Sequence, residues 1–227
     1  MTAPFGVVAL IAARNEAGRI GDTVRAAATI PHVDRIYVVE NGSTDRTVQE
    51  AREAGAWVLT APGGMGKGQA MEGALRRVSA EVYLLLDGDL GSSAKEAALL
   101  LEPVLGGRAD LTVGAFPRDA RHGGFGIVKR ASRWLIAALT NVEPQEPMSG
   151  QRALTRRVAD SVRPLAGGFG IEVAMTIDAL RLGFRFLEVP VNMEHRYTGR
   201  DLSGFAHRGR QGWDMLRAWL PRALRIR

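Results

Sequence analysis

The sequence contains no cysteine among its 227 residues, and aromatic residues make up only 6% of it. Without cysteine there are no disulfide bonds, thiolate metal sites or cysteine nucleophiles, and the redox compartment is left open. The sequence also lacks any apolar run of the roughly 18 residues that a membrane-spanning helix needs. Its first residues lack the basic and apolar segments of a signal peptide. We therefore expect a cytoplasmic protein that folds around an apolar core.

Excess positive charge is missing from most of the chain. Residues 195–227 hold eight arginines and two aspartates, which accounts for the whole net charge of +6 and leaves residues 1–194 neutral. A basic tail indicates an anionic partner, such as phosphate groups, lipid headgroups or nucleic acid. A nucleic-acid-binding module would spread its basic residues over one face with interleaved aromatics. The confinement of the charge to the tail argues against nucleic acid.

Apolar runs typical of buried strands alternate with helical patterns through the first half of the chain. The predicted strands are residues 6–13, 35–40, 56–60, 81–87 and 109–115. The predicted helices between them are residues 17–30, 45–55, 67–78 and 92–105. This alternation predicts an α/β fold with a mostly parallel central sheet flanked by helices.

The pattern changes after residue 116. Residues 117–126 are charged and glycine-rich, which predicts a mobile loop. The later predicted elements are helices at 127–139, from 155, at 172–182 and at about 204–220, and strands at 149–154 and 184–191. A chain of this length is expected to form a single domain, 1–227, with a ligand-binding half at 1–116 and a second half at 117–227 that carries the basic tail.

Two aspartates end the fourth predicted strand, in the sequence Leu84-Leu85-Leu86-Asp87-Gly88-Asp89. In an open α/β sheet, ligands bind at the carboxyl ends of the strands. Alternate residues of an extended chain share a face, so both carboxylates can address one target. Two close carboxylates repel each other, and a hard divalent cation that carries a phosphate would neutralise them. The alternative is a polar turn at an ordinary strand end.

The loops after the first three predicted strands are polar or glycine-rich. They read Ala13-Arg14-Asn15-Glu16, Glu40-Asn41-Gly42-Ser43-Thr44-Asp45-Arg46-Thr47 and Gly63-Gly64-Met65-Gly66-Lys67-Gly68. Polar side chains at strand ends can hold a base or a ribose, while glycine N–H groups and a lysine can bind a diphosphate. The structural alternative is helix capping for the first two loops, in which Ser43 and Asp45 would cap, and a surface turn for the third.

Taken in this order, the segments resemble those of the family 2 glycosyltransferases of the GT-A fold. The matching segments of the first half are the three loops and Asp87-Gly88-Asp89. Those of the second half are Ser149-Gly150-Gln151-Arg152-Ala153-Leu154 and Gly183-Phe184-Arg185-Phe186-Leu187-Glu188-Val189-Pro190-Val191, which are similar to segments of polyprenyl-phosphate sugar synthases. The resemblance covers nearly the whole chain. It implies a GT-A domain whose residues 1–116 bind a nucleotide sugar and whose residues 117–227 face the acceptor, with a terminal helix.

The resemblance also assigns roles to single residues. It places the nucleoside against Ala13, Asn15, Glu16 and Glu40. It places the diphosphate and sugar near Gly66, Lys67, Gln151, Arg152, Arg196 and Arg200. It implies Mg²⁺ or Mn²⁺ at the aspartate pair, with Asp89 the closer, catalytic ligand and Asp87 nearer the ribose and sugar. The family often has two aspartates where this chain has Glu40-Asn41, which leaves the base open.

Two further residues, His195 and Glu172, each have two possible roles. Gly91 stands where polyprenyl-phosphate mannose synthases often have a glutamine, and His195 would supply a third metal ligand instead, by similarity to glucosyl-3-phosphoglycerate synthases. His195 is otherwise a surface or hydrogen-bonded histidine. Glu172 matches the position where inverting members place a base, and it would orient sugar hydroxyls if the acceptor is already an anionic phosphate.

The resemblance implies metal-dependent transfer of a sugar from a nucleotide-diphosphate sugar, first a UDP-sugar and second GDP-mannose. We expect a phosphate-bearing acceptor, either a polyprenyl phosphate at the inner face of a membrane, reached by peripheral contact, or a phosphoglycerate-like acid. A homodimer is left open. The rival enzyme is a sugar-phosphate nucleotidyltransferase, which would have its glycine-rich basic loop directly after the first strand. The rival without catalysis is an anion-binding or nucleic-acid-binding module.

Overall fold

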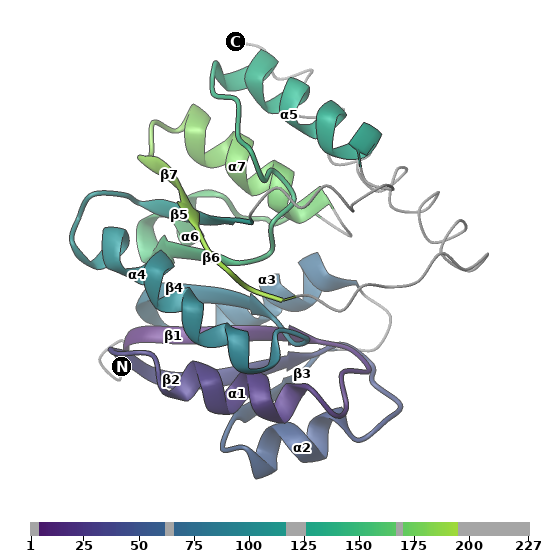
Figure 1. Cartoon of the computed structure of the whole chain (residues 1–227). Helices are drawn as coiled ribbons and strands as arrows, with labels where there is room; N and C mark the ends of the chain where they lie inside the picture. Colours follow the sequence, from purple (N-terminus) through teal and green to yellow (C-terminus); the bar gives the residue numbers. More distant parts are fainter. Residues whose placement is uncertain (1–4, 62–65, 117–125, 167–169, 195–227) are drawn as a thin grey trace.

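A computed structural model of the chain, which describes residues 5–61, 66–116, 126–166 and 170–194, contains one seven-stranded sheet in the order β3-β2-β1-β4-β6-β5-β7 (Figure 1). The strands are β1 (Phe5–Ala13), β2 (Val33–Glu40), β3 (Trp57–Thr60), β4 (Ala80–Asp87), β5 (Leu111–Ala115), β6 (Arg152–Thr155) and β7 (Phe186–Pro190). The helices are α1 (Ile20–Ala28), α2 (Thr47–Glu53), α3 (Lys67–Arg77), α4 (Ala98–Leu105), α5 (Gly126–Thr140), α6 (Arg156–Ser161) and α7 (Ile171–Arg181), with a 3₁₀ helix, η1 (Gly91–Ala97), before α4.

The order of the strands brings the carboxyl ends of β1 and β4 side by side. From β1 the chain winds outward through β2 to β3, and then it returns to the other side of β1 to form β4. The loops after β1 and β4 lead into α1 and η1, which pack against each other on one face of the sheet, whereas β3 is followed by α3 on the other face. The carboxyl ends of strands at such a change of winding are where open α/β sheets bind ligands. The fold therefore places the two loops after β1 and β4 next to each other.

One strand runs against the others. β6 pairs antiparallel with both β4 and β5, while the remaining pairs in the sheet are parallel. Arg152, the first residue of β6, lies opposite Leu85 of β4. The segment that precedes β6 consequently arrives at the same edge of the sheet as the carboxyl end of β4.

The apolar core lies on both faces of the sheet. Residues Val82–Leu86 of β4 are all buried, as expected for a strand covered on two sides. One core cluster packs side chains of α1, η1 and α4 on one face, and a second packs those of α3, α6 and α7 on the other. A third, smaller cluster joins α5 to α7. The sheet is thus the rigid support for whatever binds at its edge.

The predicted α/β fold with a mostly parallel sheet is confirmed, with local differences. The helix predicted at 92–105 is divided into η1 and α4, and Pro103 lies within α4. Helix α2 begins at Thr47, two residues later than predicted, because the Asp45 carboxylate accepts the backbone N–H of Thr47 before the helix. Ser43 does not cap α2, since its hydroxyl accepts the N–H of Asn15.

Some predictions lie outside the described residues. These are the mobility of residues 117–125 and the helix at about 204–220. Among the described helices, none has the length and apolar character needed to cross a membrane.

Candidate active site

The loop after β4 packs tightly on the end of β1. Gly88 lies so close to β1 that a Cβ atom there would be 3.1 Å from the carbonyl oxygen of Ala12 and 3.1 Å from the Cβ of Ala13. A side chain at this position would push the loop away from β1. Glycine therefore allows Asp87 and Asp89 to flank the end of β1.

Helix α1 holds this loop from the other side. The buried hydroxyl of Thr23 lies 2.9 Å from the carbonyl oxygen of Gly88 and accepts the N–H of Gly91 at 2.8 Å. The Arg19 guanidinium donates to the carbonyl oxygen of Asp89 at 3.0 Å. These three contacts fix the backbone on which Asp89 sits. Thr23 was not singled out from the sequence, because a threonine within a helix gives no local signal of a partner 65 positions away.

Lys67 joins two carboxylates that come from opposite halves of the chain. Its Nζ lies 2.7 Å from Asp87 Oδ1, at the end of β4, and 2.8 Å from Glu172 Oε1, in the first turn of α7. Burial lowers the pKa of Lys67, but the two carboxylates outweigh this effect and raise the pKa above its ordinary value. Lys67 is therefore the cation that holds Asp87 and Glu172 together.

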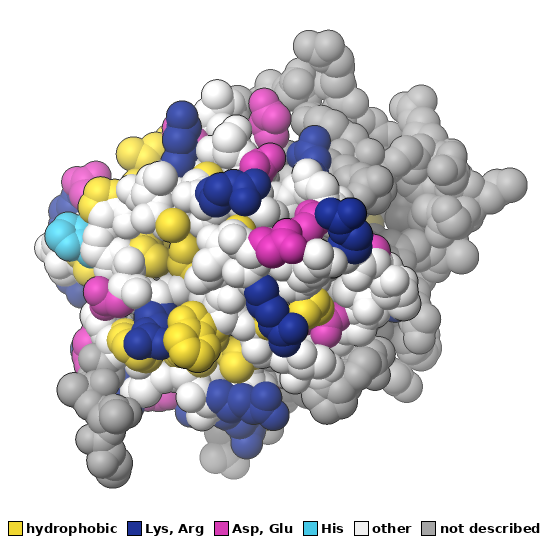
Figure 2. Space-filling view, turned by 90° about the horizontal axis from the view of Figure 1, so that it is seen from below, with side chains coloured by type: hydrophobic (Ala, Val, Ile, Leu, Met, Phe, Trp, Pro, Cys, Tyr) yellow, Lys and Arg dark blue, Asp and Glu magenta, His cyan; other side chains and the backbone are white. Residues whose placement is uncertain are grey.

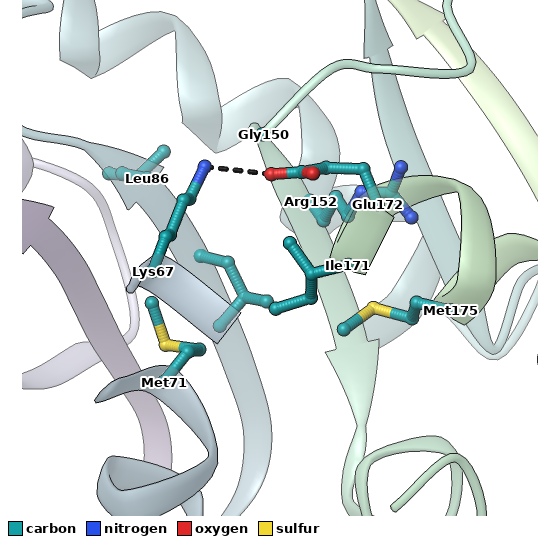
Figure 3. Close-up of a pocket in the computed structure, with 9 residues that line it drawn as sticks. Lys67, Met71, Leu86, Gly150, Arg152, Ile171, Glu172 and Met175 are labelled. Carbon is teal, nitrogen blue, oxygen red and sulfur yellow. Dashed lines mark hydrogen bonds and ion pairs between the residues drawn. The ribbon is translucent and has the colours of Figure 1, made fainter. Parts of the chain in front are cut away.

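A pocket lies beside this cluster, and Lys67 and Glu172 point toward each other across it (Figure 3). Its polar lining comes from Lys67, Gly150, Arg152 and Glu172, and its apolar lining includes Met71, Ile171 and Met175. The Glu172 side chain is only 10% exposed, whereas those of Lys67 and Asp87 are 28% and 27% exposed. The ion pairs are thus partly shielded yet open enough to exchange partners with a ligand.

The segment before β6 closes the cluster. A Cβ atom at Gly150 would lie 2.6 Å from Asp87 Oδ2 and 2.8 Å from Lys67 Nζ, so only glycine fits there without displacing the charged groups. Gln151 is fully buried, and its Nε2 donates to Asp87 Oδ2 at 3.0 Å. Its Oε1 is buried and has no hydrogen-bond partner among the described residues. A buried acceptor without a partner is unfavourable, so this oxygen would gain from a hydrogen bond with a bound water or with a group that reaches it.

Arg152 is buried beside Gln151. It is only 1% exposed. Its guanidinium donates to the carbonyl oxygen of Ser149 at 2.9 Å and to the hydroxyl of Thr176 at 3.0 Å. Burial lowers the pKa of Arg152 to about 10, against the attraction of Glu172, Glu188 and Asp87. Arg152 remains charged at neutral pH.

The two loops predicted to hold a nucleoside are linked by hydrogen bonds from one to the other. The side-chain oxygen of Asn15 accepts the N–H of Thr44 at 2.9 Å, and the hydroxyl of Thr47 accepts the N–H of Glu16 at 2.8 Å. The buried Glu40 carboxylate accepts the N–H of Ser43. Asn15, Glu16 and Glu40 are therefore brought together at the carboxyl ends of β1 and β2, next to Ala13, which ends β1.

The structure leaves part of the predicted site undescribed. His195, Arg196 and Arg200 lie outside the described residues, and Gly66 is the half-buried residue before α3, with a positive φ of 87° that favours glycine. Within the described residues, no group of three or more acids and histidines is close enough to form a complete metal cage. Asp87 and Asp89 nevertheless offer the hard oxygen donors that Mg²⁺ and Mn²⁺ prefer, and Mg²⁺ is commonly held by one or two carboxylates with substrate phosphates as further ligands. The residues present fit a metal that is bound together with a diphosphate.

Comparison with known proteins identifies the family. The model of glycosyl transferase family 2 matches residues 8–168. Glycosyltransferase AglJ of Haloferax volcanii is 33% identical over 210 residues, which are 88% of this chain and 67% of that protein. A glucosyl-3-phosphoglycerate synthase of Mycobacterium tuberculosis is 30% identical over 176 residues, and the match spans about half of that protein, 53%.

Solved structures show the same architecture. The M. tuberculosis glucosyl-3-phosphoglycerate synthase in complex with Mn²⁺, UDP-glucose and phosphoglyceric acid superposes with a TM-score of 0.81 at 25% identity, covering 96% of this chain and 79% of that one. The same enzyme with Mg²⁺ and UDP gives a TM-score of 0.82 at 26% identity, over the same shares. The predicted GT-A fold and enzyme class are thereby confirmed. The chain belongs to glycosyltransferase family 2.

Proposed function

We propose that this enzyme transfers a sugar from a UDP-sugar to a phosphate-bearing acceptor, in a reaction that depends on Mg²⁺ or Mn²⁺. The observation that carries the proposal is the cluster of Asp87, Lys67 and Glu172 at the carboxyl end of β4. It lies where an α/β sheet binds nucleotides, and the aspartate pair supplies donors for a hard cation. UDP is preferred to GDP because the similar solved structures contain UDP or UDP-glucose.

Each group has a role that follows from its position. The loops with Asn15 and Glu40 would hold the nucleoside, and Lys67 would move from the carboxylates to the diphosphate. Asp87 would then be free to contact the ribose and sugar. The divalent cation, held by Asp89 and Asp87, would stabilise the negative charge that develops on the leaving diphosphate.

Glu172 and the 149–152 segment would face the sugar. Glu172 lies 2.8 Å from Lys67, so its carboxylate would stand beside a diphosphate bound by that lysine. With a hydroxyl acceptor, Glu172 would accept its proton; with an anionic phosphate acceptor, it would orient sugar hydroxyls. The unpartnered Oε1 of Gln151 would accept a hydrogen bond from a bound hydroxyl or water. Arg196 and Arg200 stay predictions for contacts with the diphosphate, and His195 stays a prediction for a third metal ligand.

The direct test is an assay of sugar transfer with UDP-glucose, Mn²⁺ and 3-phosphoglycerate, with product detection by mass spectrometry. GDP-mannose and a short polyprenyl phosphate replace donor and acceptor in parallel reactions. Transfer from UDP-glucose supports the proposal. No transfer from any UDP-sugar, together with transfer from GDP-mannose, contradicts the proposed donor.

The metal site is tested by Asp89→Asn, which keeps the shape of the side chain and removes its charge. We expect a loss of turnover of at least about 100-fold, because charge stabilisation in the transition state depends on the bound cation. The control is Asp22→Asn, since the Asp22 side chain is 60% exposed and pairs with Arg25 of the same helix. Normal turnover by Asp89→Asn, or full wild-type turnover in excess EDTA, would refute metal dependence.

The acceptor has two candidates. A phosphoglycerate-like acid is supported by the similarity to structures that contain phosphoglyceric acid. A polyprenyl phosphate is supported by the eight arginines of residues 195–227 together with Trp213 and Trp219, because basic and aromatic residues suit a lipid headgroup region. The structural similarity favours the soluble acid as the first acceptor to test.

A further inference from the structure

We propose that Arg152 is a positioning residue for the transfer, which acts by clamping the turn at residues 147–149 to the first turn of α7. The clamp would fix Gly150 and Glu172 on two sides of Lys67. The proposal rests on the proposed function, and it concerns how the protein keeps the reacting groups in place.

The contacts of the guanidinium point in two directions. Nε donates to the carbonyl oxygen of Ser149 at 2.9 Å, and Nη2 is 3.4 Å from that of Pro147. Nη1 donates to the hydroxyl of Thr176 at 3.0 Å, and this hydroxyl donates in turn to the carbonyl oxygen of Glu172 at 3.0 Å. One side chain therefore connects the segment before β6 with the residue that carries the catalytic carboxylate.

Both ends of the clamp meet at Lys67. Gly150 follows Ser149 directly, and the approach of its Cα to Asp87 and Lys67 leaves no room even for a methyl group. Glu172 pairs with Lys67 at 2.8 Å. A small movement of either segment would open the contact with Lys67, and displacements on the order of 1 Å are enough to slow catalysis about 100-fold.

The chemistry of the side chain supports a role in geometry. Among the ion pairs of the described residues, none includes Arg152, so its buried charge is balanced by carbonyl and hydroxyl oxygens and by carboxylates at longer range. The planar guanidinium offers donors in fixed directions, whereas a lysine ammonium offers a single point of attachment. Arginine can thus donate to both segments from separate nitrogens in fixed directions, a geometry that one ammonium nitrogen does not reproduce.

The test compares Arg152→Met and Arg152→Lys with Arg77→Met, an exposed arginine of α3. We expect Arg152→Met to lower kcat about 30-fold or more, while KM for UDP-glucose and the Kd of UDP change less than about threefold. Arg152→Lys should stay at least about tenfold below wild type in kcat, because the charge alone does not restore the clamp. Arg77→Met should match wild type.

Chemical rescue separates positioning from general damage. In Arg152→Ala, millimolar methylguanidinium should restore part of kcat, and it should leave wild type unchanged. Rescue supports the clamp, because a guanidinium can reoccupy its site only in a folded protein. Unchanged kcat in Arg152→Met, or a Kd for UDP that weakens in step with kcat, would overturn the proposal.

A second variant tests the clamp if the Arg152 variants fold poorly. Thr176→Val removes the acceptor of Nη1 and leaves Arg152 in place. A kcat about tenfold lower with unchanged UDP affinity supports the clamp, and an unchanged kcat overturns it.

Hydrogen exchange tests the clamp even if the protein does not have the proposed activity. If wild type transfers no sugar, exchange in Arg152→Met relative to Arg77→Met still decides the inference. Faster exchange confined to residues 147–151 and 171–176 supports the clamp, and unchanged exchange there overturns it.

Discussion

At the scale of single residues, the site depends on the absence of side chains as much as on their presence. Gly88 and Gly150 let backbone approach the groups around Asp87, and a Cβ atom at either position would meet an atom within 3.1 Å. The charged cluster is consequently set by close packing of backbone against Asp87 and Lys67. The two glycines thus set how closely the backbone approaches these side chains.

Gly150→Ala tests this packing. The added methyl group would lie 2.6 Å from Asp87 Oδ2, so the carboxylate or the 149–151 segment must shift. We expect kcat/KM to fall at least about tenfold, with a modest decrease in Tm, because reacting groups lose their alignment. Steady-state kinetics and thermal denaturation measure the two effects.

The matched control is Gly73→Ala, in α3. Nothing lies within 4 Å of a Cβ at Gly73, and alanine favours helix by roughly 0.5–1 kcal/mol. We expect unchanged kinetics and equal or higher Tm. Equal kcat/KM in Gly150→Ala and wild type would show that the close approach has no catalytic importance.

At the scale of elements, helices and strands are held to one another by a few polar contacts between distant segments. Thr23 connects α1 to the loop of Asp89, and Asp110, just before β5, binds the backbone and the side chain of Arg185, just before β7. These contacts join segments that are far apart in the sequence. Loss of one of these contacts should loosen the element that it holds more than it disturbs the apolar core.

Thr23→Val should loosen the loop of Asp89. The valine keeps the shape of threonine but leaves the N–H of Gly91 and the carbonyl of Gly88 without their partner, which costs about 1–3 kcal/mol in buried surroundings. We expect a lower free energy of unfolding and a higher Mn²⁺ concentration for half-maximal activity. Thr29→Val is the control, since Thr29 is exposed at the end of α1. Identical metal dependence in the Thr23 and Thr29 variants would count against the role of Thr23.

Asp110 should contribute to stability at low pH in a defined way. Hydrogen bonds from the Arg185 side chain lower the pKa of Asp110 below its ordinary value of 3.8, although burial opposes the shift. A lowered pKa in the folded state means that the stabilisation is complete above the unfolded pKa and is lost as the pH falls through the folded pKa. Asp110→Asn should therefore be less stable than wild type at neutral pH, and the difference should shrink below about pH 4.

Denaturant unfolding at a series of pH values measures this difference. Glu102→Gln is the control, because the Glu102 and Arg108 side chains form an ion pair that is 72% and 61% exposed. A stability difference between Asp110→Asn and wild type that stays constant from neutral to acid pH would contradict the assignment.

At the scale of the whole molecule, charge is balanced over the body and concentrated at the C-terminal end. On the face that Figure 2 shows, basic and acidic side chains are interspersed, and hydrophobic side chains form separate small groups. Residues 195–227 supply the entire net positive charge. Any attraction to an anionic surface is therefore expected to come from this segment.

A liposome assay tests that expectation. The full chain should bind vesicles of anionic lipid at low salt and dissociate at high salt, because screened charges at the surface interact weakly. Truncation after Gly204 should remove the binding. A full-length protein that does not sediment with the vesicles, and that transfers sugar to 3-phosphoglycerate equally well without its last residues, would exclude the lipid acceptor.

The sequence predicted the parallel strands and the residues at their ends, because both depend on local patterns. Asp87, Lys67 and Glu172 could be named from motifs, although nothing in their spacing showed that one lysine joins the two acids. The reversed direction of β6 and the role of Thr23 could not be predicted, since each depends on pairing between distant segments. Gly150 was part of a motif, but the sequence could not show why glycine is needed there. A Cβ atom at this position would lie 2.6 Å from the Asp87 carboxylate, and this approach depends on the fold.

The place of β6 has a consequence for synthesis of the chain on the ribosome. β6 lies between β4 and β5, both of which are made before it. Until residues 152–155 emerge, these two earlier strands lack the neighbour that they share, and each exposes an open edge that favours association with other chains. The nascent sheet is therefore most vulnerable to aggregation before β6 is translated. For the same reason, residues 1–116 expressed alone would lack the strand that completes their sheet.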